Sequence, residues 1–207
     1  MKISIITAFP ELMRSYLAAS VLGRGIAAGK LDVEVIDIRD FAEGDYRQID
    51  DYCYGSGGMM LMAEPLAKAL ASVSAETKPY VVYPSPQGTH LYQELVEDLS
   101  RKENLVIICG HYEGVDERFT QKYVDAEISL GDFVLTGGEM PAMAIVDAVS
   151  RLIPGVVGKN SSVTEDSFYS GMLDTPHYTR PAEWRGERVP EVLTNGDAKA
   201  IDRWRRR

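Results

Sequence analysis

The chain of 207 residues contains little cysteine and no long apolar run. Its two cysteines, Cys53 and Cys109, lie far apart and neither belongs to a CxxC pair, which argues against a disulfide framework and a zinc ribbon. No apolar run approaches the roughly 18 to 20 residues of a membrane span, and the N-terminus lacks a signal-peptide pattern. We therefore expect a cytoplasmic protein with reduced thiols and no membrane partner.

Several common catalytic motifs are also missing. There is no GxxxxGK[ST] phosphate loop and no GxSxG nucleophile elbow, and the three histidines, His90, His111 and His177, lack metal-ligand spacing. The glycine-rich run at 55–58 does not fit a dinucleotide fingerprint, because Met60 stands where the third glycine is required. Kinase, hydrolase and dinucleotide readings therefore have little support, and we predict no metal ligands.

Positive charge is scarce overall, with a net charge of -9, and its distribution is uneven. Residues 1–150 contain 12 Lys and Arg against 23 Asp and Glu, a net of -11, whereas residues 151–207 contain 10 against 8, a net of +2. An acidic chain is a poor nonspecific binder of nucleic acid. The change of sign indicates two segments with different partners.

Apolar stretches of strand length alternate with segments of helical pattern. Strands are expected at 1–6, 33–38, 80–83, 105–109 and 126–130, and helices after Pro10 and at 63–74, 91–101 and 141–153. The strand at 80–83 is expected to stop at Pro84, residues 40–60 to form a long loop, and residues 197–207 a basic helix. This alternation predicts an α/β domain with a mainly parallel sheet.

Three polar, glycine-bearing segments, at 85–88, 110–114 and 136–139, follow apolar stretches. The carboxyl ends of parallel strands lie at one edge of a sheet, where ligands bind, and glycine lets a ligand approach the main chain closely. Each segment alone is compatible with a simple tight turn. Together they favour a ligand site.

Several motifs occur in an order that is typical of one known family: Ser85-Pro86-Gln87-Gly88, Cys109-Gly110-His111-Tyr112-Glu113-Gly114-Val115-Asp116-Glu117-Arg118, Gly131-Asp132-Phe133-Val134-Leu135-Thr136-Gly137-Gly138-Glu139, Ser150-Arg151-Leu152-Ile153-Pro154-Gly155-Val156, Thr164-Glu165-Asp166-Ser167-Phe168 and Asp174-Thr175-Pro176-His177-Tyr178-Thr179-Arg180-Pro181. With them the whole chain resembles the bacterial tRNA (guanine-N1)-methyltransferase (TrmD) family of the SPOUT superfamily.

The resemblance implies a SPOUT-type α/β fold with a deep trefoil knot. Residues 1–158 would form the donor-binding catalytic domain, 159–173 a linker, and 174–207 the start of a helical tRNA-binding domain. Family members usually continue for tens of residues beyond the motif at 203–205, so we expect this last domain to be truncated. The resemblance also implies S-adenosyl-L-methionine as methyl donor, a homodimer with active sites at the subunit interface, and tRNA as substrate, methylated at N1 of the guanine immediately 3′ of the anticodon (position 37).

The same resemblance assigns site residues. Those expected at the donor are Tyr83, Ser85, Pro86, Gly110, Glu113, Ile128, Gly131, Leu135, Gly137 and Gly138, and those expected at the tRNA are Asp50, His177, Tyr178 and Arg180. Guanine N1 carries a proton, and its removal pushes negative charge onto O6, so the reaction needs a base and a cation. The expected base is Asp166 and the expected cation is Arg151, with Mg²⁺ as a candidate helper.

Two departures from the family pattern and two rival functions accompany this interpretation. His111 stands where the family often has Arg, and Tyr52-Cys53 where it commonly has Arg-Pro.

By their position alone, Asp166 is also compatible with a helix N-cap and Arg151 with a helix C-terminus. The rivals are a SPOUT ribose 2′-O-methyltransferase, which would not need Asp166 as a base, and a noncatalytic RNA-binding module, which would not bind the donor.

Overall fold

The computed structural model describes residues 1–55, 57–73, 77–158, 167–168 and 174–205. The chain divides into two compact units, Met1–Asn160 and Ser161–Arg207, and each is described by itself. Within the described residues, no helix has both the length and the apolar character that crossing a bilayer requires.

The first unit is built on a five-stranded sheet in which every pairing is parallel. Its strands lie in the order β2 (Asp32–Asp37), β1 (Lys2–Thr7), β6 (Asn104–Ile108), β5 (Tyr80–His90) and β7 (Ala126–Ser129). The first strand lies between β2 and β6, with Ile3 opposite both Val33 and Leu105. The prediction of an α/β fold with a mainly parallel sheet is thereby confirmed.

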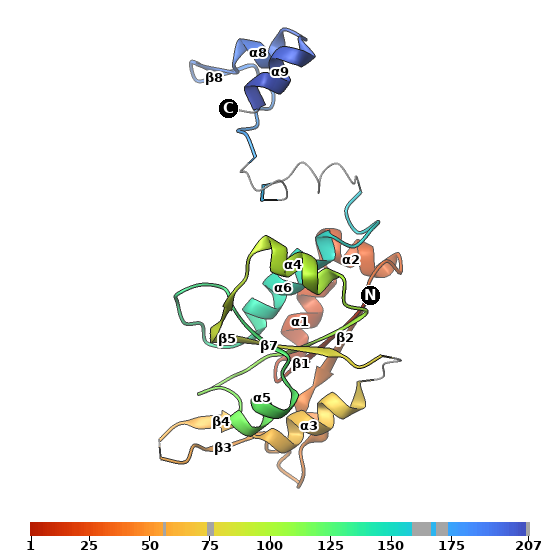
Figure 1. Cartoon of the computed structure of the whole chain (residues 1–207), viewed down its shortest axis with the longest axis vertical. Helices are drawn as coiled ribbons and strands as arrows, with labels where there is room; N and C mark the ends of the chain where they lie inside the picture. The colour runs from red at the N-terminus through yellow and green to blue at the C-terminus, as the bar shows by residue number, and fades with distance from the viewer. Residues whose placement is uncertain (56, 74–76, 159–166, 169–173, 206–207) are drawn as a thin grey trace. The chain divides into compact units, whose positions relative to one another are not determined.

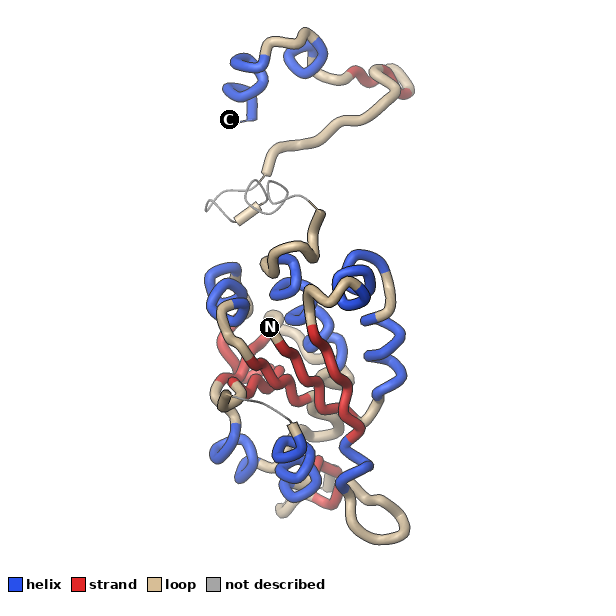
Figure 2. Tube along the Cα trace, turned by 90° about the vertical axis from the view of Figure 1, so that its right-hand side faces the viewer, coloured by secondary structure: helices blue, strands red, loops and turns tan. Residues whose placement is uncertain are grey.

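Helices cover both faces of this sheet (Figures 1 and 2). One face carries α1 (Pro10–Leu17), α2 (Ser20–Ala27), α4 (Gln93–Ser100) and α6 (Glu139–Arg151), and the other carries α3 (Ala63–Ser72) and α5 (Glu117–Tyr123). Alternate residues of β1 serve the two layers, because Ile5 belongs to the core under α6 and Ile6 to the core under α3. A strand buried on both faces explains the continuous apolar run at the start of the chain.

Strand β5 is longer than expected, so the prediction that it stops at Pro84 is wrong. It continues to His90, but Pro84 and Thr89 both pair with Ile128 of β7, and the residues between them form an irregular excursion. Proline lacks an N–H donor and is tolerated at such an irregularity. A Cβ on Gly88 would lie 2.4 Å from the main chain of Glu127, so this approach requires glycine.

The predicted loop at 40–60 contains a small hairpin, β3 (Asp50–Tyr52) and β4 (Met59–Leu61), preceded by the 3-10 turn η1 (Ile38–Phe41). The hairpin packs its main chain on the turn that follows β6: the N–H of Glu113 donates to the oxygen of Met59, and that of Leu61 to Gly114, both at 2.9 Å. Its strands have three residues each, too few to show the alternation of apolar and polar residues that predicts a strand. Helix α5 was not predicted either.

The second unit contains a two-stranded hairpin, β8 (Glu183–Trp184) with β9 (Glu187–Arg188), and the helices α8 (Glu191–Thr194) and α9 (Ala198–Arg205). Helix α9 corresponds to the basic helix expected at 197–207, whereas the hairpin was not expected. The rings of Tyr178 and Trp204 approach to 6.3 Å between centroids. Most of the predicted linker, 159–166 and 169–173, lies outside the described residues.

Candidate donor-binding site

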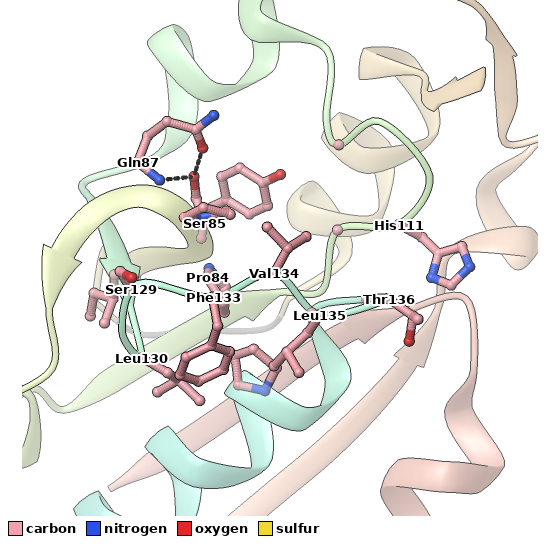
Figure 3. Close-up of a pocket in the computed structure, with 18 of the residues that line it drawn as sticks. Pro84, Ser85, Gln87, His111, Ser129, Leu130, Phe133, Val134, Leu135 and Thr136 are labelled. Atoms are coloured by element: carbon pink, nitrogen blue, oxygen red, sulfur yellow. Dashed lines mark hydrogen bonds between the residues drawn. The ribbon is translucent and has the colours of Figure 1, made fainter. Parts of the chain in front are cut away.

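A pocket of about 260 Å³ lies at the carboxyl edge of the sheet (Figure 3). Its walls come from the excursion of β5, the turn at 110–114 after β6, the end of β7, and the loop at 131–138 that leads into α6. They include the three segments, at 85–88, 110–114 and 136–139, that the sequence grouped at one edge. The parallel sheet brings them together because every strand ends on the same side.

All ten residues predicted to contact the donor line this one pocket: Tyr83, Ser85, Pro86, Gly110, Glu113, Ile128, Gly131, Leu135, Gly137 and Gly138. That they bind a donor remains a prediction. The residue-by-residue prediction did not name their neighbours, although the three grouped segments contain four of them: also lining the pocket are Gln87, His111, Tyr112, Ser129, Leu130, Phe133, Val134 and Thr136. Most of these stand within the same motifs, so extending each motif to its full length would have included them.

Two glycines bring the main chains of the pocket into direct contact. The N–H of Gly138 donates to the oxygen of Gly110 at 2.7 Å. A Cβ on Gly138 would lie 2.7 Å from the nitrogen of Gly110, and a Cβ on Gly110 would lie 2.8 Å from the ring of Tyr83. Side chains there would force the two segments apart, so this wall of the pocket consists of main-chain groups.

The polar side chains of the pocket are mostly uncharged. Ser85 Oγ donates to Gln87 Oε1 at 2.6 Å, and Ser129 Oγ donates to the oxygen of Gly131 at 3.1 Å. Burial raises the pKa of the Tyr83 hydroxyl, against a smaller opposing effect of its hydrogen bond with the Val115 main chain. The phenol therefore stays neutral at physiological pH.

The pocket can hold a flat heterocycle with polar edges, but on its own it offers little reactive chemistry. Ile128, Leu130 and Leu135 supply apolar surface, and the main chain beside them supplies donors and acceptors. Glu113 brings a carboxylate, suited to ligand hydroxyl or amino groups. The arrangement is suited to a nucleoside-like ligand, in line with the donor that the sequence predicts.

Of the two predicted catalytic residues, Arg151 does not line this pocket. Arg151 is exposed at the C-terminal end of α6 and lines a second cavity, of about 280 Å³, together with Tyr16, Ala19, Ser20, Val21, Leu22, Asp147, Ser150, Val156 and Val157. Asp166 lies outside the described residues. The described part of one chain therefore does not bring Arg151 to the candidate donor site.

The residues predicted to contact tRNA fall in both units. Asp50 begins β3, and His177, Tyr178 and Arg180 belong to the second unit. His177 Nε2 lies 2.7 Å from Asp174 Oδ2, and this hydrogen bond is the main cause that lowers the pKa of Asp174. Across the described ranges, no group of three or more His, Cys, Asp and Glu side chains is placed to hold a metal ion.

Comparison with known proteins gives a consistent result. The family described as tRNA (Guanine-1)-methyltransferase TrmD matches residues 1–207. The tRNA (guanine-N(1)-)-methyltransferase of Ruminiclostridium cellulolyticum is 45% identical over 208 residues, which cover 99% of this chain and 89% of that protein. The enzyme of the same name from Fusobacterium nucleatum is 50% identical over 206 residues, which cover 99% and 84%. The crystal structure of tRNA (m1G37) methyltransferase from Aquifex aeolicus matches with a TM-score of 0.82 at 42% identity and covers 99% of this chain and 87% of that one.

Proposed function

Because the chain belongs to the tRNA (guanine-1)-methyltransferase TrmD family, we propose that it methylates N1 of a guanine in tRNA with S-adenosyl-L-methionine as donor. The family that the motifs indicated is thereby confirmed. By its resemblance to the m1G37 enzyme, we assign the target to the guanine at position 37, directly 3′ of the anticodon.

The observation that carries the proposal is the pocket at the carboxyl edge of the sheet, which is lined by all ten residues that the family resemblance assigned to the donor. In our assignment, Ile128 and Leu135 pack on the adenine, and main-chain groups of 110–138 bind its edge. Glu113 would accept hydrogen bonds from the ribose or the amino group. The bound donor supplies a methyl group on a positively charged sulfur. The negative charge of the Glu113 carboxylate would favour binding of this cation.

The protein must also remove the N1 proton of guanine. We assign this to Asp166, which would accept the proton, and we assign to Arg151 the stabilisation of charge on O6. An aspartate has an ordinary pKa of about 3.9 and is a weak base for this proton, so the reaction depends on the guanidinium that stabilises the product charge. We assign no residue to Mg²⁺.

Since Arg151 lines a different cavity from the donor pocket, we propose that the active site forms between two copies of the chain. The donor pocket of one subunit would then meet Arg151 and Asp166 of the other. Exposed apolar side chains beside the pocket support this assembly: Phe133, Val134 and Met140 are 54%, 83% and 61% exposed. Burying them in a homodimer would remove apolar surface from water.

We further propose that the loop at 131–138 completes the trefoil knot that is typical of SPOUT proteins. Its support is the close passage of main chains at Gly138 and Gly110 and at Gly88 and Glu127. The second unit would contact tRNA through His177, Tyr178 and Arg180, with α9 adding Arg203 and Arg205. A cytoplasmic location follows from the substrate.

The test is to incubate the protein with an unmodified tRNA transcript and S-adenosylmethionine and to analyse the nucleosides by mass spectrometry. We expect 1-methylguanosine, and none from a matched transcript with adenosine at position 37. A 2′-O-methylated nucleoside would instead identify a ribose methyltransferase. No product and no binding of S-adenosylhomocysteine in calorimetry would leave a noncatalytic RNA-binding protein.

A further inference from the structure

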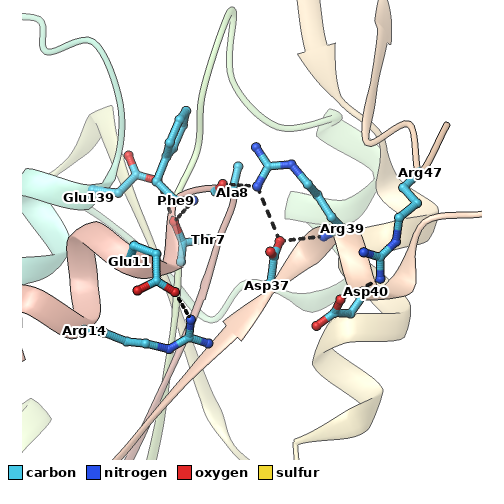
Figure 4. Close-up of polar contacts among 10 residues, drawn as sticks. All are labelled: Thr7, Ala8, Phe9, Glu11, Arg14, Asp37, Arg39, Asp40, Arg47 and Glu139. Carbon is cyan, nitrogen blue, oxygen red and sulfur yellow. Dashed lines mark hydrogen bonds and ion pairs between the residues drawn. The ribbon is translucent and has the colours of Figure 1, made fainter.

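A buried carboxylate lies behind the glycine wall of the pocket. Glu139 is 5% exposed, and its Oε1 accepts a hydrogen bond of 2.7 Å from Thr7 Oγ1, which in turn accepts one of 2.9 Å from the N–H of Phe9 (Figure 4). Glu139 is the first residue of α6, where the helix dipole favours negative charge. Burial raises the pKa of the neighbouring Cys109 thiol, and the charge of Glu139 adds to the effect.

The second oxygen of this carboxylate, Glu139 Oε2, lies close to Gly137, and so does the ring of His111. A Cβ on Gly137 would lie 2.6 Å from Glu139 Oε2 and 2.8 Å from His111 Nδ1. Gly137 and His111 also pair through an isolated β-bridge of their main chains. The acidic oxygen and the ring nitrogen therefore both lie within 2.8 Å of one point beside a pocket glycine.

His111 Nδ1 is buried and has no hydrogen-bond partner within the described part of the chain. The ring is held between two aromatic neighbours, with centroids 4.9 Å from Phe9 and 4.8 Å from Tyr112. A buried ring nitrogen without a partner is costly, and Glu139 Oε2 is an acceptor beside the same glycine, although no hydrogen bond or ion pair joins the two side chains in this structure.

We propose that His111 is a positioning residue of the donor pocket, whose Nδ1–H donates to Glu139 Oε2 across Gly137. With Thr7 on Oε1, the carboxylate then joins three segments: the end of β1, the turn at 110–114 and the start of α6. The bond would hold the 131–138 loop against the turn and so fix the shape of the pocket. The identity of the ligand rests on the proposed function, whereas the pair itself does not.

Matched substitutions at His111 separate the hydrogen bond from ring stacking. His111→Phe keeps a ring between Phe9 and Tyr112 but has no donor, whereas His111→Asn loses the ring and places an amide N–H near the position of Nδ1. We expect calorimetry with S-adenosylhomocysteine to give an affinity about tenfold weaker for His111→Phe and within about threefold of the wild type for His111→Asn. In turnover, His111→Phe should raise KM for the donor and leave kcat within about twofold.

A wild-type affinity in His111→Phe, or an equal loss in both variants, would overturn the positioning role. Thermal unfolding without ligand tests the pair separately, through a double-mutant cycle of His111→Phe with Glu139→Gln. We expect the two changes to lower Tm by less together than the sum of their separate effects, and strict additivity would show that no bond joins the residues. If the wild type does not bind S-adenosylhomocysteine, the proposed function fails, and this cycle still decides whether the pair exists.

Discussion

The two compact units differ in how they bury side chains and in how they carry charge. Every buried apolar side chain of the described chain lies between Ile3 and Val156, and no described residue of the second unit is buried. Residues 1–160 contain 14 Lys and Arg against 23 Asp and Glu, whereas residues 161–207 contain eight of each. The first unit therefore has a buried core and an acidic charge, and the second has no net charge and so repels phosphates less.

The comparison agrees with the proposed division of labour, in which binding of the donor, chemistry and capture of RNA depend on different residues. Trp184 is 61% exposed and Tyr178 is 49% exposed, and aromatic surface of this kind is suited to stacking on unpaired bases. If the division holds, substitutions outside the pocket will leave donor affinity intact, and substitutions in the second unit will leave the stability of the first unit intact. The predictions below test this from the largest effect to the smallest.

The largest effect is expected from Asp166→Asn. Loss of the proposed base should lower the rate of methyl transfer by about 10²–10⁴-fold, the usual contribution of a positioned base. Affinity for S-adenosylhomocysteine should stay within about twofold, because Asp166 is not assigned to the donor. Single-turnover rates together with calorimetry measure both quantities. A rate above about a tenth of the wild-type value would contradict the assignment.

A second large effect is expected from Arg151→Lys. Lysine keeps the positive charge but lacks the planar fork of N–H donors, so we expect the turnover rate to fall by about a hundredfold. Donor affinity should not change, since Arg151 is assigned to O6 of the guanine and not to the donor. Mixing this variant with Gly138→Val subunits tests the shared site: recovery of activity in mixed dimers would show that donor pocket and arginine come from different copies. Near-normal turnover of Arg151→Lys alone would reduce Arg151 to a structural role.

An intermediate effect is expected from Gly138→Ala in the pocket wall. The new Cβ would meet the main chain at Gly110 and Cys109 at 2.7–2.9 Å, and the strain of overpacking is about 1–3 kcal/mol. If the distorted wall loses this free energy in donor binding, the affinity falls by roughly fivefold to 150-fold. The matched control is Gly57→Ala, since nothing lies within 4 Å of a Cβ there. Equal affinities for the two variants would show that the wall does not approach the donor.

The residues of this wall could be predicted because they stand in motifs at the ends of apolar strands. The parallel sheet and the grouping of its loops followed from the pattern at 105–109 and similar runs, since buried parallel strands are continuously apolar. The path of β5 beyond Pro84 could not be predicted in this way. Its pairing with β7 is decided by a main-chain approach at Gly88, which is a tertiary contact and leaves no period in the sequence.

The proposed catalytic pair marks another limit of sequence reasoning. Chemistry dictates that a base and a cation act together, and motif resemblance assigned them to Asp166 and Arg151. Nothing in the pattern indicated that Arg151 would lie on a different cavity from the donor residues, because helix α6 starts at one cavity and ends at the other. The length of α6 therefore keeps Arg151 away from the donor pocket of its own chain, although the resemblance assigns both to one reaction.

A smaller effect is expected from removing two cations of the second unit, Arg203 and Arg205. Two lost phosphate contacts would flatten the slope of log K against log salt by about 1.5 and weaken tRNA binding several-fold at low salt. Donor affinity and Tm should not change. The control removes two cations from the first unit, Lys78 and Arg101, which lie together around a third cavity away from the donor pocket. An equal loss for both pairs would mean that charge anywhere on the chain attracts tRNA.

The smallest effect concerns the contact of Asp174 with His177 in the second unit. The hydrogen bond from His177 lowers the pKa of Asp174, with a smaller contribution from the N–H of Thr175. A carboxyl group whose pKa is lowered on folding stabilises the fold above its unfolded pKa, near 3.9, and loses that contribution as pH falls through the lowered value. His177→Ala should therefore raise the pKa of Asp174 in a carboxyl NMR titration, while Tm at neutral pH barely changes because the pair is solvent-exposed. Thr179→Ala is the control and should leave the pKa in place. A pKa that stays low in His177→Ala would show that the main chain, and not the imidazole, sets the charge at this edge of the second unit.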